Sequence, residues 1–491
     1  MVTLWLWFMS FFKSLGQTSS LTLASRIAGF GREVVFAALF GAGGFSDSMA
    51  LALKIPAFFR RIFAEGAFHA TFVPFYTRLL KNSHHQANIL CWQFGKVLMG
   101  MLCTLCLVFI VILPWFGKSL LSFPSDWTLY AIQVTFPFLL FITFTAFFSA
   151  ILNVHHQFGY AASSAAIGNI YIILGLSALY LVPAWQKTLT PWIFMTSGLC
   201  QCLWVAWPLA RQGFFHLPPA LPKDQRPSLH PFLKKFVPTA LISSTHQFSL
   251  VISTWIAFSL PKGSLSYLHY ADRIHQLPLS LIGTALGTVL LPALSRKDQP
   301  NLRVGAVMCA LTLSIPCALA LGISATDIIA LLYQRGAFTP QSTLFTAQAL
   351  QVYAWGLPAH ILTKVLVVMF FARHNTRTPL IIGTGIVLLD AALCLTFLPY
   401  FHYLGVAYAL SLSGWIHALI LMRKARSFFS LGPYVNPLVQ SIAVMGLSTG
   451  ILHLCVHSSL VKTAVGISAF LFWLWKTHIL TKSTLREWFY D

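Results

Sequence analysis

Charged residues are scarce in this chain, and acidic residues are the scarcest. Only 9% of its 491 residues are charged, with 11 Asp and Glu against 32 Lys and Arg, whereas 57% are hydrophobic. Soluble globular chains are about a quarter charged, so this composition cannot cover a protein with a water-exposed surface. The longest polar connection is residues 211–235. The composition therefore excludes an ordinary soluble protein.

Motifs for catalysis, metal binding and nucleic-acid binding are also missing. The chain has no H-E-x-x-H, no D-D-x-x-D-like run and no large soluble domain, which argues against a membrane enzyme that acts on polyprenyl phosphates. Its C-x-x-C and C-x-C pairs come without a second ligand pair. The formal charge of +21 is spread over short loops and helices without a basic tail. We therefore expect no catalytic residue, no cofactor, no metal and no nucleic-acid partner.

The chain is instead rich in apolar stretches of about 20 residues or more, the length that crosses roughly 30 Å of hydrocarbon. We predict an all-α polytopic membrane protein with about 14 transmembrane helices. The approximate spans are 16–40, 46–77, 88–117, 127–153, 157–183, 190–211, 235–260, 264–295, 304–324, 341–372, 378–399, 403–422, 434–456 and 459–480.

Loop charges and a weak internal repeat predict the domain organisation. With the N-terminus in the cytoplasm, most basic residues of the connections fall on the cytoplasmic side, which favours cytoplasmic N- and C-termini. FVPFYTR (72–78) and LLPALSR (290–296) each close a long helix at matching places in two halves. We predict two pseudo-symmetric six-helix lobes, residues 1–222 and 223–427, followed by a terminal helix pair, residues 428–491.

Several ionisable residues fall inside the predicted spans. The bases are Arg26, Arg32, Lys54, Arg60, Arg61, Lys96, Arg273 and Lys364. The acids are Glu33, Asp47, Glu65, Asp272 and Asp390. A single Arg or Lys at the centre of a span costs about 2.5–3.5 kcal/mol, so the whole set cannot face lipid. We expect these side chains to face one another or a water-filled cavity.

Pairing within a helix is one interpretation of these charges. Arg61 and Glu65 are spaced i,i+4, and Arg26 and Glu33 lie seven residues apart on one helix face. The bases outnumber the acids, so pairing cannot neutralise all of them. A net-positive hydrated cavity predicts an anionic ligand, and the forked donors of arginine favour phosphate or pyrophosphate.

Asp390 has no obvious basic neighbour in the sequence. It is either a protonated carboxyl within the lipid layer or part of a possible ion site. The cost of an unpaired charge in the membrane favours the protonated carboxyl.

Several long segments resemble one known family. They are SRIAGFGREVVFAALFGAGGFSDS (25–48), KIPAFFRRIFAEGAFHATFVP (54–74), YADR (270–273), LGTVLLPALSR (286–296) and YQRGAFT (333–339). These segments closely resemble the MurJ/MviN family of lipid II flippases, within the multidrug/oligosaccharidyl-lipid/polysaccharide exporter superfamily. The similarity covers essentially the whole chain.

The resemblance implies two six-helix lobes around a central cationic cavity, with two further helices forming a groove for a polyprenyl tail. The family's transport arginines, which bind the substrate, fall on Arg26, Arg32, Arg60 and Arg273. The residues expected to support the cavity or its gate are Glu33, Asp47, Lys54, Arg61, Glu65, Asp272 and Lys364.

The chain departs from the family pattern at a few positions. Ala57 replaces an Asn found in some members, and Gln276 replaces an acid. Where certain members bind sodium, this chain has Ser253 and Cys394, with Asp390 one turn away, which argues against a sodium site.

The resemblance implies a lipid II flippase of peptidoglycan and cell-wall biogenesis. Such a protein moves undecaprenyl-diphosphate disaccharide-pentapeptide to the periplasmic leaflet of the bacterial inner membrane by alternating access, and so supports cell shape. The alternative substrate is another polyprenyl-diphosphate-linked glycan, such as an O-antigen unit. The expected partners are lipid II and membrane lipids, and the sequence identifies no cell-wall synthesis protein as a partner.

Overall fold

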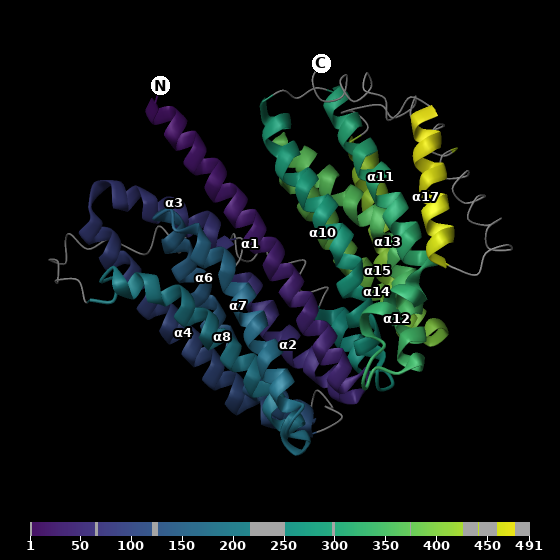
Figure 1. Ribbon diagram of the computed structural model, residues 1–491, viewed down its shortest axis with the longest axis horizontal. Coiled ribbons are helices and arrows are strands. Elements are labelled where there is room, and N and C mark those ends of the chain that lie inside the picture. Colours follow the sequence, from purple (N-terminus) through teal and green to yellow (C-terminus); the bar gives the residue numbers. More distant parts are fainter. Residues whose placement is uncertain are drawn as a thin grey trace. The chain divides into compact units, whose positions relative to one another are not determined.

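The computed structural model describes residues 2–63, 67–119, 126–216, 251–296, 300–373, 375–425, 440 and 459–476. These residues contain fifteen α-helices and no strand. The chain divides into two compact units, Met1–Val251 and Ile252–Asp491 (Figure 1). The all-α fold predicted from the apolar stretches is confirmed.

The first unit is a bundle of eight α-helices in its described residues. They are α1 (Val2–Phe40), α2 (Gly44–Phe63), α3 (Ala67–Asn82), α4 (His84–Ser119), α5 (Asp126–Thr135), α6 (Phe138–Val154), α7 (Phe158–Leu179) and α8 (Gln186–Arg211). Within this unit α1 packs along α7, and both α6 and α7 pack against α8. The packing of α7 is important for the site, because it fixes one face of α1.

Aromatic rings form the core where α3, α4 and α6 meet. The ring of Phe72 lies 5.6 Å from that of Phe94 and 5.4 Å from that of Phe147, measured between centroids, and it stacks on Tyr76 at 5.6 Å. All of these side chains are buried. Such ring pairs contribute about 0.5–1.5 kcal/mol each beyond burial. Van der Waals packing of this kind holds helices together where lipid tails are as apolar as the side chains.

The second unit contains seven α-helices in its described residues. They are α10 (Ser264–Arg296), α11 (Pro300–Ile323), α12 (Ala325–Tyr333), α13 (Pro340–Ala372), α14 (Arg377–Phe401), α15 (Tyr403–Ala425) and α17 (Ser459–Lys476). Helix α13 packs against α10, α11, α12 and α15 and is the centre of this unit (Figure 1). Its start is well defined, since Thr339 caps it by accepting the Ser342 backbone N–H at 3.2 Å, with Pro340 at the first helical position.

Small residues allow α13 and α15 to approach closely. A Cβ added to Gly356 would lie 2.9 Å from the Cα atom of Ser411, which is closer than real Cβ atoms come. At the same contact the Ser411 hydroxyl donates to the Val352 carbonyl oxygen at 2.9 Å. Small residues and interhelical hydrogen bonds of this kind are typical of membrane helix packing.

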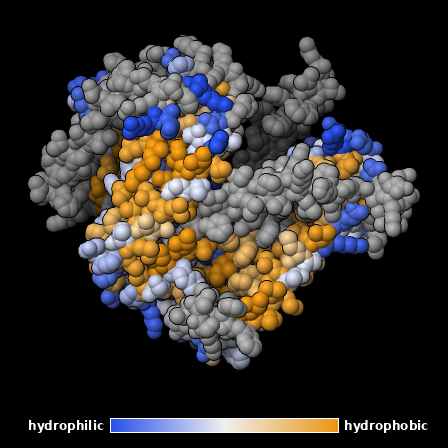
Figure 2. All heavy atoms as spheres, turned by 180° about the vertical axis from the view of Figure 1, so that it is seen from behind, coloured by the Kyte–Doolittle hydropathy of each residue, from blue (hydrophilic) through white to orange (hydrophobic). Residues whose placement is uncertain are grey.

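The described surface is suited to lipid. Eight helices or helix pairs are long and apolar enough to cross a membrane: His84–Ile112, Asp126–Val154, Phe158–Leu179, Pro183–Arg211, Pro300–Ile323, Pro340–Ala372, Arg377–Phe401 and Tyr403–Ala425. Large apolar side chains on them are exposed, including Leu107, Leu174 and Leu388, each at 66–69%. Figure 2 shows a broad hydrophobic area on the visible face, with hydrophilic residues toward its margins. A surface of this kind is stable only in lipid or against another apolar surface.

Most predicted spans agree with the observed helices wherever the structure describes them, with a few differences. The first helix, α1, begins at Val2 and not near residue 16. The span 127–153 is interrupted by a turn at Phe136 and Pro137, which separates α5 from α6. The span 46–77 contains α2 and α3, and residues 64–66 between them lie outside the described residues. The short helix α12 was not predicted. Span 434–456 and most of span 235–260 fall outside the described residues, although residues 251–258 are helical.

The lobe boundaries stay a prediction. The predicted boundary between residues 222 and 223 falls in the segment 217–250, outside the described residues. Of the predicted terminal pair, 428–491, the structure describes chiefly α17.

Candidate functional site

The ionisable residues expected in the membrane lie on a small set of helices. Arg26, Arg32 and Glu33 are on α1, and Asp47, Lys54, Arg60 and Arg61 are on α2, all in the first unit. Asp272 and Arg273 are on α10, Lys364 on α13 and Asp390 on α14, all in the second unit. Glu65 lies outside the described residues, and with it the predicted Arg61–Glu65 pair.

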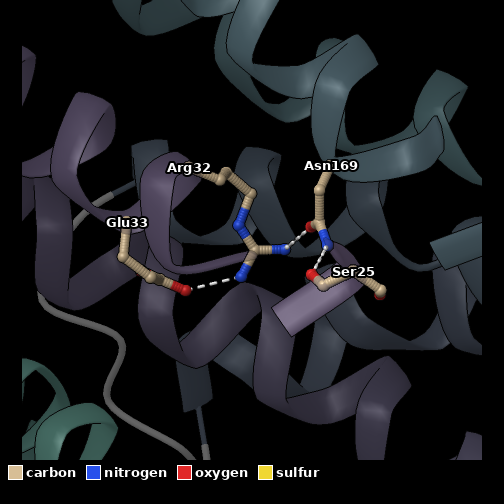
Figure 3. Close-up of polar contacts among 4 residues, drawn as sticks. All are labelled: Ser25, Arg32, Glu33 and Asn169. Atoms are coloured by element: carbon tan, nitrogen blue, oxygen red, sulfur yellow. Dashed lines mark hydrogen bonds and ion pairs between the residues drawn. The ribbon is translucent and has the colours of Figure 1, made fainter. Parts of the chain in front are cut away.

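Arg32 is held by groups on two helices (Figure 3). Its Nη2 atom pairs with the Oε1 atom of Glu33 at 2.5 Å, and its Nη1 donates to the Oδ1 atom of Asn169 at 3.1 Å. The amide of Asn169, which is on α7, donates in turn to the Ser25 carbonyl oxygen of α1 at 3.3 Å. The ring of Phe194 on α8 lies 5.7 Å from the guanidinium carbon. The guanidinium plane is therefore fixed on several sides.

This arrangement leaves Arg32 able to bind an anion. A guanidinium has five N–H donors, and the two hydrogen bonds formed with described residues use only two of them. The side chain of Arg32 is 21% exposed, whereas that of Glu33 is 9% exposed, so the base is the more accessible member of the pair. An arginine whose orientation is fixed in advance loses less entropy when it binds phosphate oxygens.

The other first-unit bases are more accessible than the acids near them. Arg26 is exposed, and Lys54, Arg60 and Arg61 are half-buried. Asp47, in contrast, is 6% exposed in the first turn of α2, where the helix dipole favours a negative charge. The accessible charge of the described part of α1 and α2 is thus positive.

The loop before α2 has a defined conformation that explains part of the glycine-rich motif. Gly41 has a φ of 63°, which favours glycine, and the hydroxyl of Ser46 donates to its carbonyl oxygen at 2.7 Å. The hydroxyl of Ser48 shares a hydrogen bond of 2.7 Å with that of Thr128 on α5. These contacts place Asp47 between two anchored serines.

In the second unit, Asp272 bonds within α10, and Lys364 reaches α10 from α13. Gln276 donates through Nε2 to Asp272 Oδ2 at 2.5 Å, so the residue that replaces a family acid bonds to Asp272. The Nζ atom of Lys364 lies 3.5 Å from the Leu279 carbonyl oxygen. The aliphatic part of the Lys364 side chain packs on Gly283, where an added Cβ would lie 2.8 Å from the Lys364 Cδ atom. The half-buried Arg273 is on the same stretch of α10.

Asp390 is buried, at 2% exposure, and lies between two serines. Its Oδ2 accepts from the Ser253 hydroxyl at 3.3 Å, and its Oδ1 accepts from the Ser413 hydroxyl at 3.2 Å. Cys394 is buried one turn along α14. Within the described residues no group of three His, Cys, Asp or Glu side chains is arranged to hold a metal ion.

Sequence reasoning missed two of these partners, Asn169 and Ser413. Asn169 stands in the apolar segment AASSAAIGNIYIIL, and a lone amide there is a signal, because a polar group within the membrane needs a partner. Ser413 carried no such signal, since serines are common in this chain's helices and their hydroxyls often bond to their own backbone.

Comparison with known proteins agrees with this pattern of helices and charges. A family model described as lipid II flippase MurJ matches residues 36–475. A probable lipid II flippase MurJ of Rhizobium meliloti is 34% identical over 442 residues, which are 84% of this chain and 80% of the relative. The lipid II flippase MurJ of Burkholderia cenocepacia is 30% identical over 469 residues, which are 91% and 90% of the two chains.

Solved structures resemble the chain as well. A lipid II flippase MurJ in an inward closed conformation aligns with a TM-score of 0.79 at 25% identity, over 94% of this chain and 99% of that one. An inward-facing multidrug resistance transporter of the MATE family, in the MOP superfamily, aligns with a TM-score of 0.67 at 14% identity, over 84% and 97% of the chains. The second likeness is one of fold alone.

Proposed function

This chain belongs to the lipid II flippase MurJ family, and from that premise we propose that it moves lipid II across a bacterial membrane. The substrate is undecaprenyl-diphosphate disaccharide-pentapeptide, carried from the cytoplasmic to the periplasmic leaflet for peptidoglycan synthesis. The observation that carries the proposal is the family match over residues 36–475. The relatives' names support lipid II over another polyprenyl-linked glycan such as an O-antigen unit.

In this proposal the diphosphate is bound by four arginines, Arg26, Arg32, Arg60 and Arg273. The fixed guanidinium of Arg32 supports its part in this role, because a fork held by Glu33 and Asn169 still has donors for phosphate oxygens. The residues that support the binding site or its gate are Glu33, Asp47, Lys54, Arg61, Glu65, Asp272 and Lys364. The contribution expected of Glu33 is to hold the guanidinium of Arg32 in a fixed orientation.

The proposed mechanism is alternating access. The headgroup enters a cationic cavity while the polyprenyl tail stays in lipid, against the helices of residues 428–491. Opening toward one leaflet and then the other carries the headgroup across. No covalent bond is made or broken, so no catalytic residue takes part.

We further propose that the protein lies in the inner membrane with both termini in the cytoplasm. The distribution of basic residues over the connections supports this orientation. A cysteine at Lys187 should react with an impermeant thiol reagent added outside, whereas a cysteine at Arg423 should not. The reverse pattern would refute the orientation.

The test of function is complementation of a strain depleted of its own lipid II flippase, with lipid II accessibility at the outer leaflet as the readout. The wild-type chain should restore growth and flipping. Alanine at any of the four arginines should severely weaken flipping, because each lost charged hydrogen bond costs about 1.5–3 kcal/mol, roughly ten- to a hundredfold in affinity. Lysine should rescue only partly, since an ammonium is a point charge.

A matched control separates these arginines from cationic surface residues. Arg377 is exposed at the start of α14, and Arg377→Ala should flip normally at equal expression. If all four alanine variants also flip normally, the diphosphate-binding role is wrong. If the wild-type chain itself fails to complement at normal membrane levels, the lipid II assignment is wrong.

A further inference from the structure

A buried histidine lies on the interface between α10 and α13, beside Asp272. His275 is 3% exposed, and neither its Nδ1 nor its Nε2 atom has a hydrogen-bond partner among the described residues. Its Nδ1 atom is 4.0 Å from the Oδ1 atom of Asp272. Its ring centroid lies 5.6 Å from that of Tyr353 and 5.8 Å from that of His360, both on α13.

Within the part of the chain that the structure describes, the hydrogen bonding of this imidazole is incomplete. Neutral imidazole has one N–H donor and one acceptor nitrogen, and leaving both unmade inside a protein is unfavourable. A proton converts the acceptor nitrogen into a second donor. The carboxylate of Asp272 is the acceptor at hand, because closing the 4.0 Å separation by about an ångström makes a charged hydrogen bond.

Proton binding here affects a second contact of the same carboxylate. Asp272 already accepts from Gln276 through Oδ2 at 2.5 Å, whereas Oδ1 is the oxygen 4.0 Å from His275. Turning the carboxylate toward a protonated His275 weakens that bond. The proton state of His275 therefore sets the position of the acid next to Arg273, which we assigned to the diphosphate.

The surrounding charges make this proton responsive to an anion. Three helices packed against α10 carry ionisable side chains. Those of α13 that face His275 are Tyr353, His360 and Lys364. Helix α15 carries His417, and α11 carries Arg303, Cys309 and Cys317. Burial and the positive charge of Lys364 oppose protonation, while Asp272 favours it. An anion that neutralises Lys364 removes the electrostatic part of this opposition, while the effect of burial remains. Binding of the anion and binding of the proton are then mutually favourable, as linkage requires.

We propose that His275, with Asp272 as its partner, is a proton-binding site that couples proton uptake to the binding and release of the lipid diphosphate. The coupling to transport rests on the proposed flippase function, but proton binding at His275 does not. The ligand of the site is a proton, and the element that responds is the Asp272–Gln276 contact of α10.

The first test is direct and needs no transport. In the full-length protein in lipid nanodiscs with labelled histidine, followed by nuclear magnetic resonance, one imidazole signal should titrate in the wild type and disappear in His275→Asn. Asp272→Asn should move that titration to lower pH, because an amide stabilises imidazolium less than a carboxylate does. A His275 signal that stays neutral throughout, or that ignores Asp272→Asn, overturns the proposal.

The second test measures coupling. Lipid II flipping by reconstituted wild-type protein should fall about tenfold per pH unit above the midpoint found by the first test. His275→Asn should flatten this profile. His402→Asn is the matched control in the same unit, since His402 is exposed at the C-terminal cap of α14, and it should keep the wild-type profile.

The outcomes separate the two proposals. If His275→Asn keeps the wild-type pH profile, the coupling is wrong even where the first test finds a titrating His275. If wild-type protein does not flip lipid II, the proposed function fails, and the nuclear magnetic resonance titration alone decides whether His275 binds a proton.

Discussion

Replacing Asn169 by alanine tests whether the site depends on contacts made far along the chain. The change removes the acceptor of the Arg32 guanidinium, at 3.1 Å, and the donor to the Ser25 carbonyl oxygen, at 3.3 Å. A hydrogen bond to a charged group contributes about 1.5–3 kcal/mol and a neutral one about 0.5–1.5 kcal/mol. The lower ends of both ranges apply, because Arg32 keeps Glu33 and the bond to Ser25 is long. The expected loss is about 2 kcal/mol.

Two assays divide this loss between fold and function. The midpoint of thermal unfolding in detergent should fall by a few degrees, since α1 loses a tie to α7. The rate of lipid II flipping at low substrate should fall about tenfold, because the bond to Arg32 accounts for about 1.5 kcal/mol of the loss and this energy is worth that factor in binding. Asn169→Asp keeps an acceptor for Arg32 but not the donor to Ser25, so it should recover much of the flipping and less of the thermal stability.

The control for this prediction is on the same helix. Tyr171 donates to the Thr196 hydroxyl at 3.1 Å on the exposed face of α7, and Tyr171→Phe removes only that bond. It should leave both measurements close to wild type. If Asn169→Ala behaves like Tyr171→Phe in both assays, Asn169 does not position Arg32.

Three further perturbations test other parts of the structure. Gly356→Ala sets a methyl group 2.9 Å from the Ser411 Cα atom and should cost about 1–3 kcal/mol of stability, seen as a lower unfolding midpoint, whereas Gly383→Ala meets nothing within 4 Å and should be neutral. Asp390→Asn should keep flipping if the carboxyl is normally protonated, because the serine hydroxyls can rotate to suit an amide; loss of flipping at normal membrane levels would instead indicate a cation site. The pKa of His155 is lowered from 6.5 by burial and then by two neighbouring histidines, so the unfolded chain takes up the proton first. The contribution of His155 to the free energy of unfolding should therefore be full above about pH 6.5 and should decline as the pH falls below it. The unfolding midpoint, measured against pH, should decline less in His155→Gln than in the wild type, and an equal decline in both would contradict this.

Composition alone predicted the helical membrane fold of the described residues. A chain segment in hydrocarbon has no water to bond, so it must satisfy its own backbone hydrogen bonds, and a long apolar segment does so as a helix. The same cost of charge in lipid singled out Arg26, Arg32, Glu33 and Asp272 before any contact was known. These inferences need only the local sequence, because each concerns one segment and its solvent.

Pairing of side chains could not be predicted in this way. Spacing on a helix favoured Glu33 as a partner of Arg26, which stays a prediction. The structure shows a pair that the spacing did not indicate, between Glu33 and its neighbour Arg32, since a long guanidinium side chain can reach back to the adjacent carboxylate. The refinements of helix boundaries are similar: the turn at Phe136 and Pro137 divides a segment whose apolar pattern is continuous.

The tertiary structure decided which polar groups meet. Asn169 is 137 residues from Arg32, and Ser253 is likewise 137 residues from Asp390. Sequence alone shows a lone amide in an apolar helix and a buried acid without a basic neighbour, each needing a partner. Only the packing of α7 on α1, and of the helical residues 251–258 and α15 around Asp390, determines what that partner is, because hydrogen bonds act over about 3 Å and helix packing sets which faces come that close.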